Sequence, residues 1–127
     1  MFRSPPSVRI LLDTHALLWF LEGSPRLGVK VRNAIRNIQN DVFVSPAAIW
    51  EISIKDRLGK LALPEPFAEN RIALLPIEIP HILMHRTLPL HHHDPFDRLI
   101  IAQALEENLT IATCDPLFAP YGVSVEW

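Results

Sequence analysis

Four acidic residues that are far apart in the sequence have surroundings in which they could act together on a cation. Asp13 directly follows a short apolar run, Asp97 lies on the first turn of an expected helix, and Asp115 follows a second apolar run. Glu51 lies within the largely apolar segment 47–54, where an unpaired carboxylate is costly. Clustered carboxylates repel one another and raise each other's pKa, and a divalent cation removes that repulsion. Oxygen ligands suit Mg²⁺ or Mn²⁺, and such an ion can activate a water to hydrolyse a phosphodiester.

Each acid also has a simpler structural explanation. Asp13 could cap a helix, and Asp115 before Pro116 has the pattern of an N-cap. Glu51 could form a helix salt bridge with Lys55, which follows it by four residues. Caps and surface ion pairs are much commoner than functional sites, so any one of these acids alone would indicate little. The occurrence of all four in one short chain favours a shared site.

The helix expected to begin near residue 94 has a well-marked start. Asp94 is followed by Pro95, which is typical of an N-cap residue and the first helical position. The residues that follow are mostly apolar or small, so we expect a helix that is buried on more than one side. Asp97 could complete a capping box with Asp94, or it could bind a ligand. The sequence alone leaves that choice open.

Short apolar runs alternate with helical patterns along the chain. The predicted strands are 8–12, 41–44, 74–79, 109–112 and 123–125, and the predicted helices are 15–21, 28–39, 45–57, 64–71, 80–87 and 94–108. This alternation predicts one three-layer α/β/α domain over residues 1–127, with a mainly parallel sheet of roughly five strands. Ligands bind at the carboxyl ends of the strands in such a sheet, so the four acids should meet at that edge.

The composition limits the possible locations and partners. The single cysteine, Cys114, excludes an internal disulfide and fits a reducing cytosol. No apolar run approaches the ~20 residues of a membrane span, and residues 1–7 lack the apolar core of a secretory signal. We therefore expect a cytoplasmic protein without a membrane segment. The net charge of −2 does not indicate nucleic-acid binding, so a polyanion would have to meet local basic residues.

Several polar residues near the acids could assist them. Thr14 and Thr113 add hydroxyls that could bond a metal-bound water, although turns and caps also use such residues. Residues that could contact RNA phosphates are Lys55, Arg86, His93 and Arg98. The run 91–93 of three histidines suggests zinc, but zinc sites usually need four nitrogen or sulfur ligands, and exposed loop histidines are the simpler explanation.

Four motifs, in order, resemble the PIN domain and, more narrowly, the VapC-type toxins of type II toxin–antitoxin pairs. They are Asp13-Thr14, Ile49-Trp50-Glu51-Ile52, Asp94-Pro95-Phe96-Asp97-Arg98 and Thr113-Cys114-Asp115. The resemblance extends over almost the whole chain. It implies a metal-dependent endoribonuclease that forms a homodimer and is neutralised by a VapB-type antitoxin. It also implies that Asp13, Glu51, Asp97 and Asp115 bind the metal, with Asp94 as the helix cap.

Two other classes of protein are alternatives. A phosphoacceptor receiver domain has a similar layered fold, but it needs an acid pair after the first strand and a lysine after the last. This chain has Asp13-Thr14 and no lysine after Lys60, which disfavours that class. The other alternative is a non-catalytic partner-binding module whose acids only cap helices.

Overall fold

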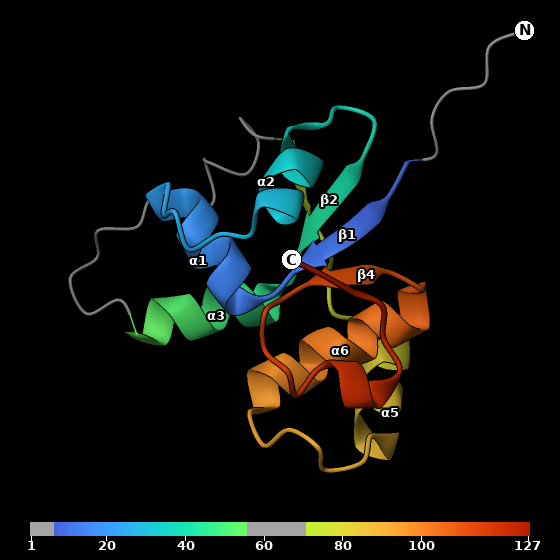
Figure 1. Ribbon diagram of the computed structural model, residues 1–127. Helices are drawn as coiled ribbons and strands as arrows, with labels where there is room; N and C mark the ends of the chain where they lie inside the picture. Colours follow the sequence, from blue (N-terminus) through green and yellow to red (C-terminus); the bar gives the residue numbers. More distant parts are fainter. Residues whose placement is uncertain (1–6, 56–70) are drawn as a thin grey trace, which may run out of the picture.

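A five-stranded, wholly parallel sheet forms the centre of the molecule (Figure 1). The structure is a computed structural model that describes residues 7–55 and 71–127. The strand order is β3-β2-β1-β4-β5. The strands are β1 (Arg9–Leu12), β2 (Asp41–Val44), β3 (Ile72–Leu74), β4 (Thr110–Ala112) and β5 (Val125–Glu126). The predicted α/β class and parallel sheet are confirmed.

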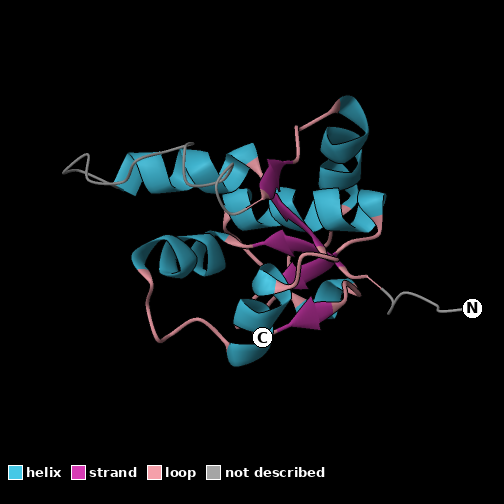
Figure 2. Cartoon of the chain, turned by 90° about the horizontal axis from the view of Figure 1, so that it is seen from above, coloured by secondary structure: helices cyan, strands magenta, loops and turns pink. Residues whose placement is uncertain are grey.

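Helices cover the sheet on both sides (Figure 2). They are α1 (Thr14–Glu22), α2 (Val29–Arg36), α3 (Pro46–Lys55), α5 (Ile79–Thr87) and α6 (Pro95–Glu107), with a 3-10 helix η1 (Ala119–Tyr121). Burial on both faces explains why the central strands are continuous apolar runs rather than alternating ones. Ile10, Leu11 and Leu12 of β1 all have 1% exposure or less.

The strand order reverses next to β1. The chain runs from β1 to β2 and then to β3, after which it crosses back to β4 on the other side of β1. Helices α1 and α2 lie on one side of β1 and β2, whereas α5 and α6 lie on the other side (Figure 1). In open parallel sheets the ligand site lies at such a reversal, outside the carboxyl ends of the strands. The ends of β1 and β4 are therefore where a site is expected.

Helix α6 is the most deeply buried helix near that reversal. Its central residues 100–104 are all buried, and it packs against both α5 and α3. Asp94 is its N-cap and Pro95 its first residue, as predicted. The helix ends at Asn108, whose φ of 55° lies in the left-handed region that asparagine tolerates well. Packing on two sides fixes the start of α6 against the sheet.

The third predicted strand, 74–79, is wrong. Strand β3 ends at Leu74. The last hydrogen bond to β2 is the one from the Leu75 N–H to the Val44 carbonyl. Pro76 has no N–H with which to continue the ladder. Glu78 then caps α5: its side chain accepts from the backbone N–H of His81, and the His81 side chain accepts from the Glu78 N–H. The apolar residues after Leu74 thus belong to a connection and a helix start.

Smaller differences concern the ends of elements. The predicted helix 28–39 ends at Arg36, because Asn37 is extended. The predicted last strand, 123–125, is shifted to Val125–Glu126. The predicted helix 64–71 lies, apart from Arg71, outside the described residues. Within the described ranges, no helix is long and apolar enough to cross a membrane.

Candidate metal centre

Asp13 connects the end of β1 to the start of α1. It is the N-cap of α1, and its Oδ1 accepts a hydrogen bond from the Ala16 N–H at 2.7 Å. Its backbone N–H donates to the Ala112 carbonyl of β4, which holds it at the junction of the two strands. Asp13 is only 4% exposed. The predicted cap is confirmed, and the carboxylate is buried at the edge where the strand order reverses.

Glu51 lies on α3 and is 5% exposed, but it is not unpaired. Its Oε1 accepts a hydrogen bond from the Thr14 hydroxyl at 2.7 Å, and its Oε2 lies 2.6 Å from Lys55 Nζ. The predicted pair of Glu51 and Lys55 is therefore present. The bond from Thr14 ties α3 to the first turn of α1, so two helices hold this carboxylate in place.

The start of α6 supplies two more carboxylates. Asp94 Oδ1 accepts from the backbone N–H groups of Phe96 and Asp97, at 2.8 and 3.1 Å. One carboxylate oxygen from each of Glu51, Asp94 and Asp97 lies within 4.8 Å of the others. The residue predicted as a cap and the residue predicted as a ligand thus lie side by side. The cap uses Oδ1 and leaves the second oxygen of Asp94 without a backbone partner among the described contacts.

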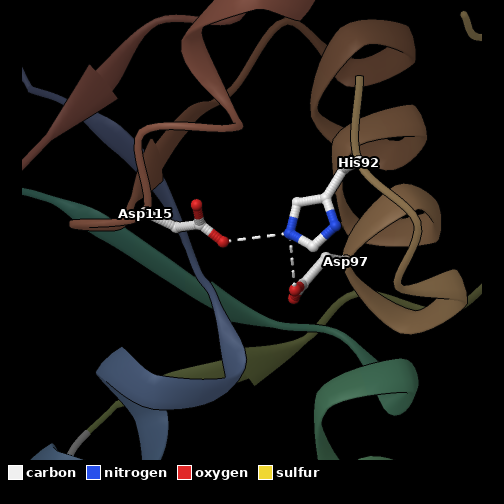
Figure 3. Close-up of side chains that lie close together, drawn as sticks. All are labelled: His92, Asp97 and Asp115. Atoms are coloured by element: carbon white, nitrogen blue, oxygen red, sulfur yellow. Dashed lines mark hydrogen bonds and ion pairs between the residues drawn. The ribbon is translucent and has the colours of Figure 1, made fainter. Parts of the chain in front are cut away.

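Asp115 approaches Asp97 from the segment that follows β4. Its Oδ1 accepts from the Leu117 N–H at 2.9 Å, and its backbone N–H donates to the Thr113 hydroxyl at 3.0 Å. Its Oδ2 lies 2.9 Å from His92 Nε2, and the same nitrogen lies 3.1 Å from Asp97 Oδ2 (Figure 3). His92, Asp97 and Asp115 form a second group with ligand atoms within 4.8 Å of one another. Asp97 belongs to both groups and so lies at the centre of the cluster.

The electrostatics show that the acids are short of positive charge. Burial and the negative charges of four neighbouring acids together raise the pKa of Asp97 to about 8, with burial as the larger cause; the acids are Asp94, Glu51, Asp13 and Asp115. Burial also raises the pKa of Asp13, although hydrogen bonds from Thr113 and Ala16 oppose that effect. The pKa of the Lys55 ammonium is raised, chiefly by its hydrogen bond with Glu51. One ammonium does not neutralise this many carboxylates. The cluster of oxygen donors fits a hard divalent cation.

The predicted RNA contacts lie in different surroundings. Lys55 is at the mouth of the cluster and is 67% exposed. Arg86 and His93 are exposed, on α5 and on the loop before α6. Arg98 instead donates to carbonyls of its own chain, at Leu88, Pro89 and His92, and to the Tyr121 hydroxyl. These bonds occupy its guanidinium group, and through them Arg98 holds the loop before α6.

Sequence reasoning missed His92. It treated the histidine run as exposed loop and placed only His93 near the acids, whereas His92 is 8% exposed and contacts two of the acids. His91 and His93 are exposed on either side of it. Alternate residues of an extended segment point in opposite directions, so one of three consecutive histidines is expected to face inward. That alternation was the only available signal, and it could not say which histidine it was.

Comparison with known proteins points to one family. A family model described as the PIN domain matches residues 10–122. The curated protein Ribonuclease VapC16 from Mycobacterium tuberculosis is 34% identical over 67 residues. That match covers 45% of this chain and 48% of the relative, so the aligned region spans about half the length of each protein.

Solved structures share the fold. The crystal structure of FitAcB from Neisseria gonorrhoeae has a TM-score of 0.64 and 23% identity, covering 91% of this chain and 95% of that chain. The crystal structure of VapBC2 from Rickettsia felis, bound to a DNA fragment from their promoter, has a TM-score of 0.69 and 16% identity. It covers 94% of this chain and 98% of that chain. The whole arrangement of sheet and helices is thus similar to theirs.

Proposed function

This chain belongs to the PIN domain family, and on that premise we propose that it is a metal-dependent endoribonuclease that acts as the toxin of a toxin–antitoxin pair. The observation that carries the proposal is the position of Asp97. Its carboxylate belongs to both groups of potential ligands, and burial with four acidic neighbours raises its pKa to about 8. A site that only capped helices would not need Glu51 of α3 and Asp115 from the segment after β4 within ligand distance of Asp97, with the charge of Asp13 acting on Asp97 as well. The partial match to a ribonuclease supports the same activity.

We assign the metal to Asp13, Glu51, Asp97 and Asp115. Mg²⁺ or Mn²⁺ fits a donor set dominated by carboxylate oxygens. A cation bound there supplies a Lewis acid that polarises a phosphate oxygen and lowers the pKa of a water. The protein holds the carboxylates through fixed donors: the Thr14 hydroxyl on Glu51, and backbone N–H groups on Asp13 and Asp115. These bonds position the oxygens before the ion arrives.

Binding of RNA needs positive charge beside this acidic centre. Lys55 lies at the mouth of the cluster with its ammonium group largely exposed, so it can contact a phosphate while it remains paired with Glu51. Arg86 and His93 are exposed and remain proposed contacts further out. The net charge of the chain is −2, so attraction of RNA depends on these local groups and not on the overall charge.

We propose two protein partners in the cytoplasm. The first is an antitoxin of the VapB type, because similar structures include FitAB and VapBC2 bound to DNA fragments. The second is another copy of this chain. Trp50 of α3 and Ile82 of α5 are each about half exposed or more, and they line one apolar pocket together with Phe96 of α6, the helix that packs against both. A cluster of large apolar side chains of this kind is typical of a protein interface, and we assign it to a homodimer.

The test of activity is cleavage of labelled RNA with Mg²⁺ or Mn²⁺, with and without EDTA. The key variant is Asp13→Asn, because asparagine is also a good N-cap and keeps the start of α1 while it removes the charge. Asp41→Asn is the matched control, since Asp41 is exposed at the start of β2. We expect cleavage by the wild type and the control, and loss of cleavage with EDTA or in Asp13→Asn. Equal cleavage by all proteins would indicate a contaminant, and no metal binding would favour the non-catalytic module.

A further inference from the structure

We propose that His92 is a positioning residue, whose Nε2–H bridges Asp97 and Asp115 and sets the spacing of these two carboxylates for the metal. This inference rests on the proposed metal site. The imidazole stands between an acid from α6 and an acid from the segment after β4, with Nε2 at 3.1 and 2.9 Å from their Oδ2 atoms (Figure 3). Within the described chain, no other side chain contacts both acids.

The neighbouring backbone determines which ring nitrogen carries the proton. His92 Nδ1 lies 3.1 Å from the backbone nitrogen of Asp94, and an N–H group can only donate. Nδ1 therefore accepts this bond and carries no proton. The proton of the neutral ring is on Nε2, where both Asp97 and Asp115 can accept it. The ring thus acts as a donor toward the acids.

This tautomer excludes His92 as a metal ligand. A nitrogen that carries a proton has no free lone pair for an ion. Nε2 could become a ligand only if the proton moved to Nδ1, where it would point at the N–H of Asp94. His92 therefore acts on the metal through the carboxylates that it orients, as outer groups often do in metal sites.

The ring is also held firmly in place. The His92 backbone N–H donates to the Tyr121 hydroxyl at 2.7 Å, and Arg98 Nη1 donates to the His92 carbonyl at 3.4 Å. Arg98 also bonds Tyr121, so the two anchors form one network. Phe118 packs edge-on against the imidazole, which is 8% exposed. An imidazole fixed on this many sides keeps its place when the site is filled.

The experiment measures the affinity for Mn²⁺ by calorimetry in wild type, His92→Leu and His92→Gln. Leucine removes the donor, and we expect the Kd for Mn²⁺ to rise about tenfold or more. Glutamine places an N–H near the position of Nε2, so we expect a Kd within about threefold of the wild type. His85→Gln on α5 is the matched control, with an unchanged Kd. Circular dichroism and thermal melting confirm that each variant is folded.

Two further measurements separate this role from others. Nitrogen NMR of the wild type should show the proton of His92 on Nε2 both without metal and with saturating Mg²⁺. If the protein cleaves RNA, saturating metal should restore cleavage by His92→Leu, because the residue acts through metal binding. Loss of the Nε2 proton on adding metal would make His92 a ligand and overturn the proposal. Tighter Mn²⁺ binding by His92→Leu would also overturn it, since His92 would then block the site. The Mn²⁺ affinity and the nitrogen NMR do not require that RNA be the substrate, so they test this role separately from the proposed activity.

Discussion

Replacing Asp97 by asparagine should make the metal-free protein more stable, although it should also abolish metal-dependent activity. Asp97 lies among Asp94, Glu51, Asp13 and Asp115, and its pKa is raised to about 8, first by burial and then by these charges. Asparagine has nearly the same shape, and its carbonyl oxygen can still accept the hydrogen bond from His92. The substitution therefore removes the charge and little else. A site built to bind a cation should be a source of instability without one.

The size of the gain follows from linkage. A carboxyl whose pKa is higher in the folded than in the unfolded protein has no effect on stability while both states are protonated. It destabilises the fold increasingly as the pH rises from about 4 to about 8. Near pH 7 the stability gained by removing this charge is at most about 4 kcal/mol, since each pKa unit corresponds to about 1.4 kcal/mol. Because the side chain of Asp97 is still 17% exposed, solvent screens part of this energy. We expect a gain of about 1–2 kcal/mol, or about 4–8 °C in Tm.

The assay is thermal unfolding in EDTA at several pH values, with Asp41→Asn as the control for a change of net charge at an exposed site. The stability difference between Asp97→Asn and wild type should be small near pH 4 and should grow toward pH 8. Added Mn²⁺ should stabilise the wild type and have little effect on Asp97→Asn. If Asp97→Asn melts at or below the wild-type temperature in EDTA near pH 8, the reasoning about charge repulsion is wrong.

Other variants test separate parts of the site. Thr14→Val should reduce RNA cleavage about tenfold or more, because it removes a hydrogen bond to the Glu51 carboxylate, whereas Thr14→Ser should stay close to wild type. Asp94→Ala should lower the free energy of unfolding by about 1 kcal/mol, and Asp94→Ser should keep the cap; loss of Mn²⁺ affinity in the folded Asp94→Ser would make Asp94 a ligand as well. Lys55→Gln should raise the KM for RNA. It should also reduce the slope of log KM against log salt by about 1, the contribution of one phosphate contact. Mn²⁺ binding should be tighter near pH 8 than near pH 6 and should release protons, measured by calorimetry in buffers of different ionisation enthalpy, because Asp97 is protonated below about pH 8.

Features set by neighbours in the sequence could be predicted. The pair Asp94-Pro95 placed the start of α6, and the apolar run before Asp13 placed β1 and the cap of α1. The spacing of Glu51 and Lys55 predicted their ion pair. These features depend on backbone groups or side chains within about one helical turn, which a local pattern can specify.

Features set by distant contacts could not be predicted. Strand β3 begins at Ile72 because that residue pairs with Val42 of β2, which is far away in the sequence. Pro76 was a local signal against a strand over 74–79, but it could not show that the strand begins before Leu74. The direction of His92 depends on Tyr121 and Arg98, which come from other parts of the chain. Pairings of this kind are decided by tertiary structure and override local preference.

The capping of α1 and α6 by Asp13 and Asp94 has a consequence for how a polyanion can approach so many carboxylates. Both helices begin at the cluster, so the positive ends of their macrodipoles point toward it. Each helix start is equivalent to roughly half a positive charge. Together they offset about one carboxylate without any cationic side chain, and their peptide dipoles remain in place at every pH at which the protein is folded.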